Sequence, residues 1–347
     1  MPHKKFRLKI VFCTVLAGLL AWSVMTAQAT PAGLAAARHF PTIANCPLFP
    51  ANNVWNRPIT DLPVHSLSAA YVQAIGAGSG LHADFGAGLW NNGPIGIPYN
   101  LVNSSTLRVA VGFTYAGESD AVTYPIPANP LIEGGTNSTG DRHILMVDST
   151  ACILYELYKV VPPSGGLGWR AGSGAVFNLR SNTLRPDTWT SADAAGLPIL
   201  AGLARYDEVA AGHIDHALRF TVPVSQRAYV WPARHYASPE TGTNYPPMGM
   251  RFRLKSSFDT STYLPQARVV LEALKKYGMI VADNGSEWYI SGVPDEGWDN
   301  SALHTLGQVT GDNFEAVDES NLYRVPGSAA VPWYPGLPGV WIPLVRK

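Results

Sequence analysis

The sequence predicts a mainly β fold, similar to a β-sandwich or jelly roll and carrying a few peripheral helices. Between about residues 106 and 260, short runs rich in β-branched and aromatic residues alternate with clusters of Gly, Pro, Asn and Asp. This pattern is typical of strands joined by turns rather than of alternating βαβ units. The runs are LRVAVGFTY, RHILMVD, CILYELYKV, GAVFNL, HALRFTV, RAYVWPARHY and MRFRLKS.

The first 29 residues have the order of a secretory signal peptide. The basic segment MPHKKFRLK precedes the apolar run IVFCTVLAGLLAWSVM, and the small-residue motif AQA ends at Ala29. This order predicts cleavage after Ala29 and secretion of residues 30–347, outside the cell or into the periplasm. An uncleaved membrane anchor is the alternative, although the apolar run is short for a span. The secreted part is predicted to be a single β-rich catalytic or binding domain with a Pro- and Trp-rich C-terminal tail.

Three helices are predicted. The clearest runs from Pro265 to the stop residue Gly278, because apolar residues recur between them at helical spacing. The others are predicted over residues 66–75 and 199–210, each next to Gly or Pro signals that bound a helix.

Two hairpins are predicted from local signals. Strands over 142–148 and 152–160 are separated by only three residues, which is hairpin spacing. The segments MIVADNG and WYISG are predicted to pair through a turn at Asn284 and Gly285.

Two cysteines remain after signal cleavage, Cys46 and Cys152. An even number in an exported chain predicts a disulfide between them, with two buried thiols as the alternative. The third cysteine, Cys13, lies within the predicted signal peptide.

Charge and composition limit the classes of binding partner that the sequence predicts. The chain has 25 basic and 25 acidic residues, and charged residues make up only 14% of it. It has no basic tract or basic amphipathic helix, so neither nucleic acid nor a membrane surface is expected as a partner of the mature chain. The content of 10 Trp and 15 Tyr favours a polysaccharide or oligosaccharide partner, since flat aromatic faces stack on sugar rings, although aromatic residues also fill ordinary cores.

The candidate catalytic residues come from the alternation of side chains along the predicted strands. His216 shares a strand face with Ile214, Leu218 and other apolar residues, and His143 and Glu156 each occupy a similar row. If the strands over 142–148 and 152–160 form a hairpin, His143 and Glu156 face the same side. A buried carboxylate is costly unless it is paired, protonated or set in a cleft, so these three groups predict a groove with convergent polar side chains.

Other residues extend the predicted groove. Asp141 precedes His143 and is a candidate second carboxylate, with a turn-forming role as the alternative. Substrate binding is predicted for Arg142, Arg219, Trp231 and His235. For these groups structural roles stay open as well, namely an arginine partner for Glu156, hydrogen-bonded core histidines and a surface position for Arg219.

No metal or cofactor is expected. The sequence contains no HExxH, CxxC or HxH motif and no phosphate-binding glycine loop. A set of His143, His216 and Glu156 would resemble a 2-His-1-carboxylate site, but only if the predicted strand faces are right. No G-x-S-x-G motif is present, which disfavours a serine hydrolase.

Several segments resemble those of a group of exported bacterial proteins with no established activity. They are STGDRHILMVD, YELY, WTSADAAGLPI, GHIDHALRF, YVWPARHYAS and KKYGMIVADNGSEWYISG. The resemblance covers most of residues 50–318 and implies export and one long domain. It implies no catalytic residues.

The function expected from these observations is that of a secreted glycoside hydrolase. Glu156 is the expected acid, because apolar neighbours raise the pKa of a carboxyl, and Asp141 is its expected partner, positioned by His143 and His216. One alternative is a polysaccharide lyase, in which Arg219 or Arg142 neutralises a uronate, His216 removes the C5 proton and a tyrosine protonates the leaving oxygen. The other is a carbohydrate- or wall-binding protein without turnover.

Overall fold

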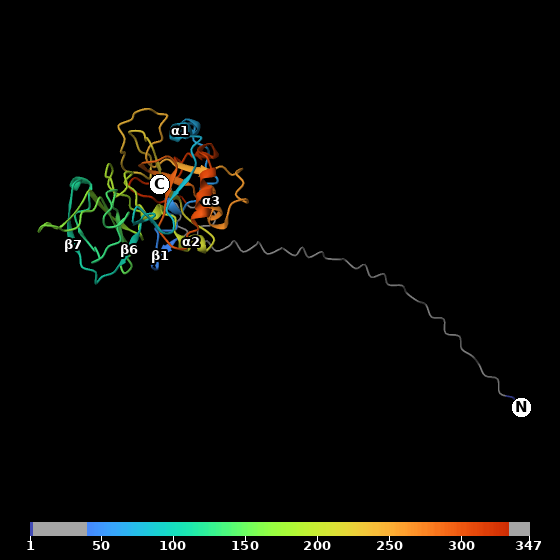
Figure 1. The fold of residues 1–347 in the computed structure, drawn as a ribbon. Helices are drawn as coiled ribbons and strands as arrows, with labels where there is room; N and C mark the ends of the chain where they lie inside the picture. Colours follow the sequence, from blue (N-terminus) through green and yellow to red (C-terminus); the bar gives the residue numbers. More distant parts are fainter. Residues whose placement is uncertain (3–39, 333–347) are drawn as a thin grey trace, which may run out of the picture. The chain divides into compact units, whose positions relative to one another are not determined.

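A computed structural model describes residues 1–2 and 40–332. Within these residues short strands form several separate sheets and the helices are few, which confirms the predicted mainly β class with peripheral helices (Figure 1). Residues 3–39 and 333–347 lie outside the described residues. They include nearly all of the predicted signal peptide and the end of the predicted tail. No helix in the described part of the chain is long and apolar enough to cross a membrane.

The largest sheet has six strands of mixed direction. Its order is β17 (Phe314–Ala316), β14 (Arg251–Leu254), β15 (Met279–Asn284), β13 (Leu218–Val222), β16 (Tyr289–Ser291) and β3 (His82–Asp84). β13 is parallel to β15 and β16 is parallel to β3, whereas the other neighbours are antiparallel. Because β13 and β15 are interior strands, most side chains on both of their faces are buried.

Helix α3 (Pro265–Lys276) packs against β14 and is the longest helix among the described residues (Figure 1). It begins with a proline, whose fixed φ suits the first helical position, and it ends just before Gly278, which has a φ of +68°. The predicted helix is confirmed, and so is the predicted helix over 66–75, where the structure has α1 (Ser68–Ile75).

A four-stranded sheet and a three-stranded sheet make up a second part of the fold, green in Figure 1. The first has the order β12 (Ser173–Asn178), β10 (Ile153–Tyr158), β9 (Ile144–Asp148) and β6 (Tyr99–Val102), and the second has β11 (Trp169–Ala171), β7 (Val109–Phe113) and β8 (Thr123–Tyr124). Side chains from both sheets share a small hydrophobic core of their own. β9 and β10 are antiparallel neighbours joined by a short turn, which confirms the predicted hairpin.

The predicted disulfide is present. Cys46, in the short strand β2 (Cys46–Pro47), is bonded to Cys152, in the turn that leads into β10. β2 pairs with β1 (Thr42–Ile43), so the bond ties the start of the described chain to the four-stranded sheet.

The predicted hairpin at Asn284 and Gly285 is wrong. β15 and β16 do not pair with each other, because β13 lies between them and pairs with both. The turn is local, but the strand that fills the space between its arms comes from more than fifty residues earlier in the chain.

Two further local predictions are wrong. The run RAYVWPARHY forms a loop between β13 and β14 rather than a strand, and Pro232 within it has no N–H to offer a sheet. The predicted helix over 199–210 is divided into a 3₁₀ turn, η3 (Leu200–Gly202), and a short helix, α2 (Tyr206–Ala210). The backbone N–H groups of Ile199 and Leu200 donate to the Glu156 carboxylate, outside any helical ladder.

Candidate functional site

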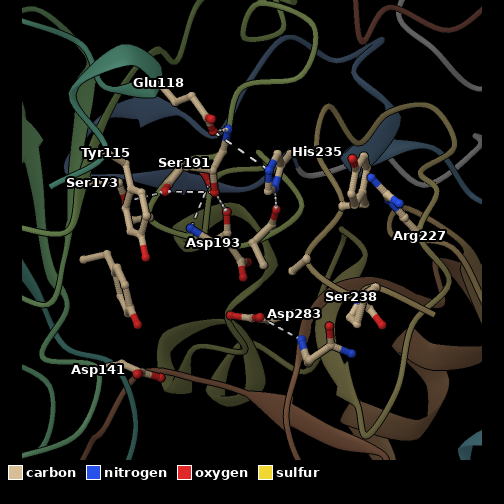
Figure 2. A pocket seen from close by; sticks show the side chains of 18 residues that line it. Tyr115, Glu118, Asp141, Ser173, Ser191, Asp193, Arg227, His235, Ser238 and Asp283 are labelled. Atoms are coloured by element: carbon tan, nitrogen blue, oxygen red, sulfur yellow. Dashed lines mark hydrogen bonds and ion pairs between the residues drawn. The ribbon is translucent and has the colours of Figure 1, made fainter.

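A cleft of about 840 Å³ lies where strand ends from the two larger sheets come together. Residues of β10, β12 and β15 line it together with the loop over 190–194 and the loop over 235–239 (Figure 2). Most of its functional groups are carboxylates, hydroxyls and aromatic rings.

Asp283 lies near the C-terminal end of β15 and contributes a carboxyl to the cleft. The strand is fully buried through Ala282, and Asp283 is the first residue that opens toward the cleft (Figure 2). Burial, followed by the nearby Asp193 carboxylate, raises the pKa of Asp283 to about 7. Arg219 and the N–H of Asn284, which donates to Asp283 Oδ1 at 2.7 Å, act in the opposite direction. At neutral pH Asp283 is therefore able to hold a proton.

Asp193 lies beside Asp283 and is held by a buried arginine. Arg219, on β13, donates from Nε and Nη2 to the two carboxylate oxygens of Asp193, both at 2.8 Å. Only 1% of the Asp193 side chain and 6% of the Arg219 side chain are exposed. The loop around Asp193 is fixed as well, because Ser191 Oγ donates to the carbonyls of Asp193 and Leu197. Asp193 is thus a rigid, charge-compensated neighbour of Asp283.

Asp141 contributes an exposed carboxylate to the same cleft. Tyr158, at the end of β10, also lines the cleft, and burial raises its pKa, with smaller contributions from the charges of Asp141 and Asp283. Figure 2 shows Asp141, Asp193 and Asp283 arranged around one space, each carried by a different part of the chain.

Aromatic and cationic groups line the remaining walls. His235 donates from Nδ1 to the Ala194 carbonyl at 2.9 Å, and its ring is parallel to that of Tyr236 at a centroid distance of 5.6 Å. The guanidinium of Arg227 lies over the Tyr236 ring at 5.7 Å. Tyr115 leaves 54% of its surface exposed at the opposite side of the cleft (Figure 2). Flat rings around carboxylates form a surface suited to sugars.

Among the predicted site residues, only Asp141 and His235 line this cleft. Glu156 is fully buried beneath it and accepts hydrogen bonds from the N–H groups of Ile199 and Leu200 at 3.0 and 2.9 Å. Burial raises the pKa of Glu156 to about 7, against the effect of those two hydrogen bonds. Its two oxygens hold the backbone of the loop that ends the cleft wall.

His143 directly precedes β9, and its ring lies 5.5 Å from that of Tyr158, which shares a face of β10 with Glu156. His143 is buried, with Nδ1 2.6 Å from Glu133 and Nε2 3.0 Å from the Ala192 carbonyl. Burial opposes the charged imidazolium, but Glu133 outweighs it and raises the pKa of His143 to about 9. The protonated ring donates to both partners and supports the 190–194 loop from below.

His216 is fully buried away from the cleft, between the carboxylate of Glu208 at 3.1 Å and the carbonyl of Ala217 at 2.8 Å. It precedes β13, so the strand-face argument that included it does not apply. The Arg219 side chain is buried because β13 is an interior strand, which corrects the alternative of a surface position.

Arg142 and Trp231 also have partners elsewhere. Arg142 donates to the carbonyls of Val160, Thr136 and Ser138 and so connects the segment before β9 with the segment after β10. Trp231 donates from Nε1 to the Ser328 carbonyl at 2.8 Å. Neither residue lines the cleft.

Five cleft residues were not predicted from the sequence, namely Asp283, Asp193, Glu118, Tyr115 and Tyr158. One signal was present for Asp283, since MIVA is an apolar run that ends at a charged residue, and ligands often bind beyond the carboxyl ends of parallel strands. No comparable local signal marks Asp193, because its partner Arg219 is 26 residues away.

Within residues 40–332, no group of three or more His, Cys, Asp or Glu side chains is arranged to hold a metal ion. Comparison of the chain with protein-family models, curated proteins and solved structures found no match.

Proposed function

We propose that the protein is a glycoside hydrolase whose catalytic acid is Asp283. The observation that carries the proposal is that Asp283, a cleft carboxyl with a pKa of about 7, shares the cleft with the solvent-exposed carboxyl of Asp141. Glycosidases need one carboxyl that is protonated at working pH and a second that is ionised. In this proposal Asp283 takes the acid role assigned to Glu156 from sequence, because Glu156 does not reach the cleft.

In the proposed reaction Asp283 transfers its proton to the glycosidic oxygen while the bond from that oxygen to the anomeric carbon breaks. Asp141, which is open to solvent, removes a proton from a water molecule while the oxygen of that water bonds to the anomeric carbon. The products are two sugar chains with a new reducing end, and solvent returns the protons to their starting positions. Asp193 and Arg219 position and tune Asp283 rather than react.

Charge favours a substrate without acidic sugars. Among the cleft's carboxyls, Asp193 is paired with Arg219 and Asp283 carries the proton in the proposed reaction. Glu118 and Asp141 remain, and Arg227 is the only arginine or lysine among the lining residues. A uronate would meet this excess of negative charge, and the arginines that the lyase hypothesis requires, Arg142 and Arg219, are already bonded within the protein. A neutral glycan stacked on the aromatic rings avoids the repulsion.

The test is a panel of neutral and uronate-containing polysaccharides incubated with purified protein comprising residues 30–347. Release of reducing ends and ultraviolet absorbance of unsaturated products are followed together, with and without a chelator. Reducing ends without absorbance support hydrolysis, and Asp141→Asn should then lower the rate while the exposed control Asp259→Asn does not. Absorbance that rises with the reducing ends would support the lyase. Binding without either signal would support a non-catalytic glycan-binding protein.

A further inference from the structure

A second cleft, of about 680 Å³, lies on other elements of the fold. β3, β16, helix α4 (Asn300–His304) and the hairpin of β4 (Leu89–Trp90) and β5 (Gly93–Pro94) contribute to it. None of its lining residues lines the cleft that contains Asp283. Nothing in the proposed reaction uses it.

Trp90 is the most exposed aromatic side chain of this cleft, with 73% of its surface open. The hairpin that carries it turns through Asn91 and Asn92, whose φ angles of 50° and 65° match a tight two-residue turn. Gly93 packs so closely on Gly134 that an added Cβ would lie 2.2 Å from the Gly134 carbonyl oxygen. The hairpin therefore packs closely against the neighbouring loop, which sets the backbone position of Trp90.

A second flat surface comes from two strands of the large sheet. His82 and Tyr289 are register partners in the parallel pair β3–β16, and their rings stack with a centroid distance of 4.0 Å. Burial lowers the pKa of His82, which keeps its imidazole neutral at neutral pH. The stacked pair thus presents uncharged aromatic surface to the same cleft as Trp90.

The polar groups of the cleft are mainly acceptors. Asp84 and Glu133 both line it, and Glu133 is already compensated by His143 at 2.6 Å. The amide of Asn300 is occupied, since it donates to and accepts from the backbone of Ala87. A ligand with many O–H donors and no charge fits carboxylates placed among flat rings, whereas an anion would meet the carboxyl of Asp84 with no lysine or arginine among the lining residues.

We propose that this cleft is a second, non-catalytic binding site for a neutral oligosaccharide, which stacks on Trp90 and on the His82–Tyr289 pair and donates hydroxyl hydrogens to Asp84 and Glu133. The site holds a polymer on the protein independently of turnover. The inference goes beyond the proposed hydrolase and does not require it.

The test is titration calorimetry of purified protein comprising residues 30–347 with cellohexaose, xylohexaose, mannohexaose and laminarihexaose. Trp90→Ala should weaken binding of at least one probe by about tenfold or more, because stacking buries the indole face. Trp90→Phe should recover part of the affinity. Leu107→Ala, which removes a side chain that is 75% exposed and lies outside both clefts, should bind as the wild type does. Since Trp90 is exposed, the variants should unfold at the wild-type temperature.

Tyr115→Ala separates the two sites, because Tyr115 lines only the Asp283 cleft. Binding that depends on Trp90 and survives Tyr115→Ala supports the second site, even if no glycan is hydrolysed. The absence of any Trp90-dependent binding across the probes would overturn it, whether or not hydrolysis is found.

Discussion

Arg219 donates two hydrogen bonds of 2.8 Å to the carboxylate of Asp193, and this buried pair determines the setting of Asp283. The carboxylate of Asp193 is thereby held close to Asp283, where its negative charge favours the protonated form of Asp283, while the positive charge of Arg219 acts in the opposite direction. Burial and the Asp193 charge accordingly raise the pKa of Asp283 to about 7. A compensated carboxylate and a protonated carboxyl then occupy one cleft.

Removing Arg219 should destabilise the fold. In Arg219→Met, Asp193 stays buried without its partner, and we expect the free energy of unfolding to fall by about 3–5 kcal/mol. Urea unfolding of the wild type and the variant measures this difference in the free energy of unfolding. The matched control is Asp187→Asn, which breaks the exposed Arg234–Asp187 pair and should cost less than about 1 kcal/mol. Equal effects of the two variants would show that the buried pair contributes no special stability.

The His143–Glu133 pair should make stability depend on pH in the alkaline range. The pKa of His143 in the folded protein is about 9, above the ordinary value of 6.5, so the pair's contribution to stability is complete below about pH 6.5 and is lost as pH rises through 9. The difference in unfolding free energy between wild type and His143→Gln should shrink over that window by an amount on the order of 3 kcal/mol. Glu133→Gln should abolish the same pH dependence. A constant difference from pH 6 to 9.5 would contradict the ionised pair.

Glu156→Gln should affect stability and not the chemical step. Glutamine offers one acceptor oxygen to the N–H groups of Ile199 and Leu200, so we expect a loss of about 1–3 kcal/mol at low pH. Because the raised pKa makes the wild type lose stability from about pH 4.5 to 7, the gap to the variant should narrow over that range. A well-folded Glu156→Gln with a selective loss of kcat would instead support the acid role expected from sequence.

The disulfide should stabilise the chain through its long loop. Cys46 and Cys152 are 106 residues apart, and loop-closure entropy alone corresponds to about 4–5 kcal/mol for a loop of this length. The Cys46→Ser, Cys152→Ser double variant should therefore unfold at a lower guanidinium concentration than the oxidised wild type. Under reducing conditions the two proteins should converge, and a persistent difference would point to packing of the sulfurs instead.

Elements with local signals were predictable from the sequence. Helix α3 has its starting proline and its stop glycine within one segment, and the strands β9 and β10 are separated by only four residues. The cysteine count was likewise sufficient to pair Cys46 with Cys152.

The site depends on contacts that no local pattern contains. Strand alternation assigned Glu156 and His216 to a groove, but interior strands are buried on both faces, so an inward position does not imply a cleft. Asp283 stands at the end of β15, which pairs with β13, and its neighbour Asp193 is held by Arg219 from a distant segment of the chain. These pairings are set by the tertiary fold.

The most direct test of the central claim is the pH dependence of hydrolysis by wild type and Asp283→Asn on a glycan that the wild type cleaves. If Asp283 is the acid, the wild-type rate should fall as pH rises through about 7, where Asp283 loses its proton. Asp283→Asn should be slower by about 100-fold or more without that limb, while Asp259→Asn matches the wild type. A wild-type rate and pH profile in Asp283→Asn would contradict the account.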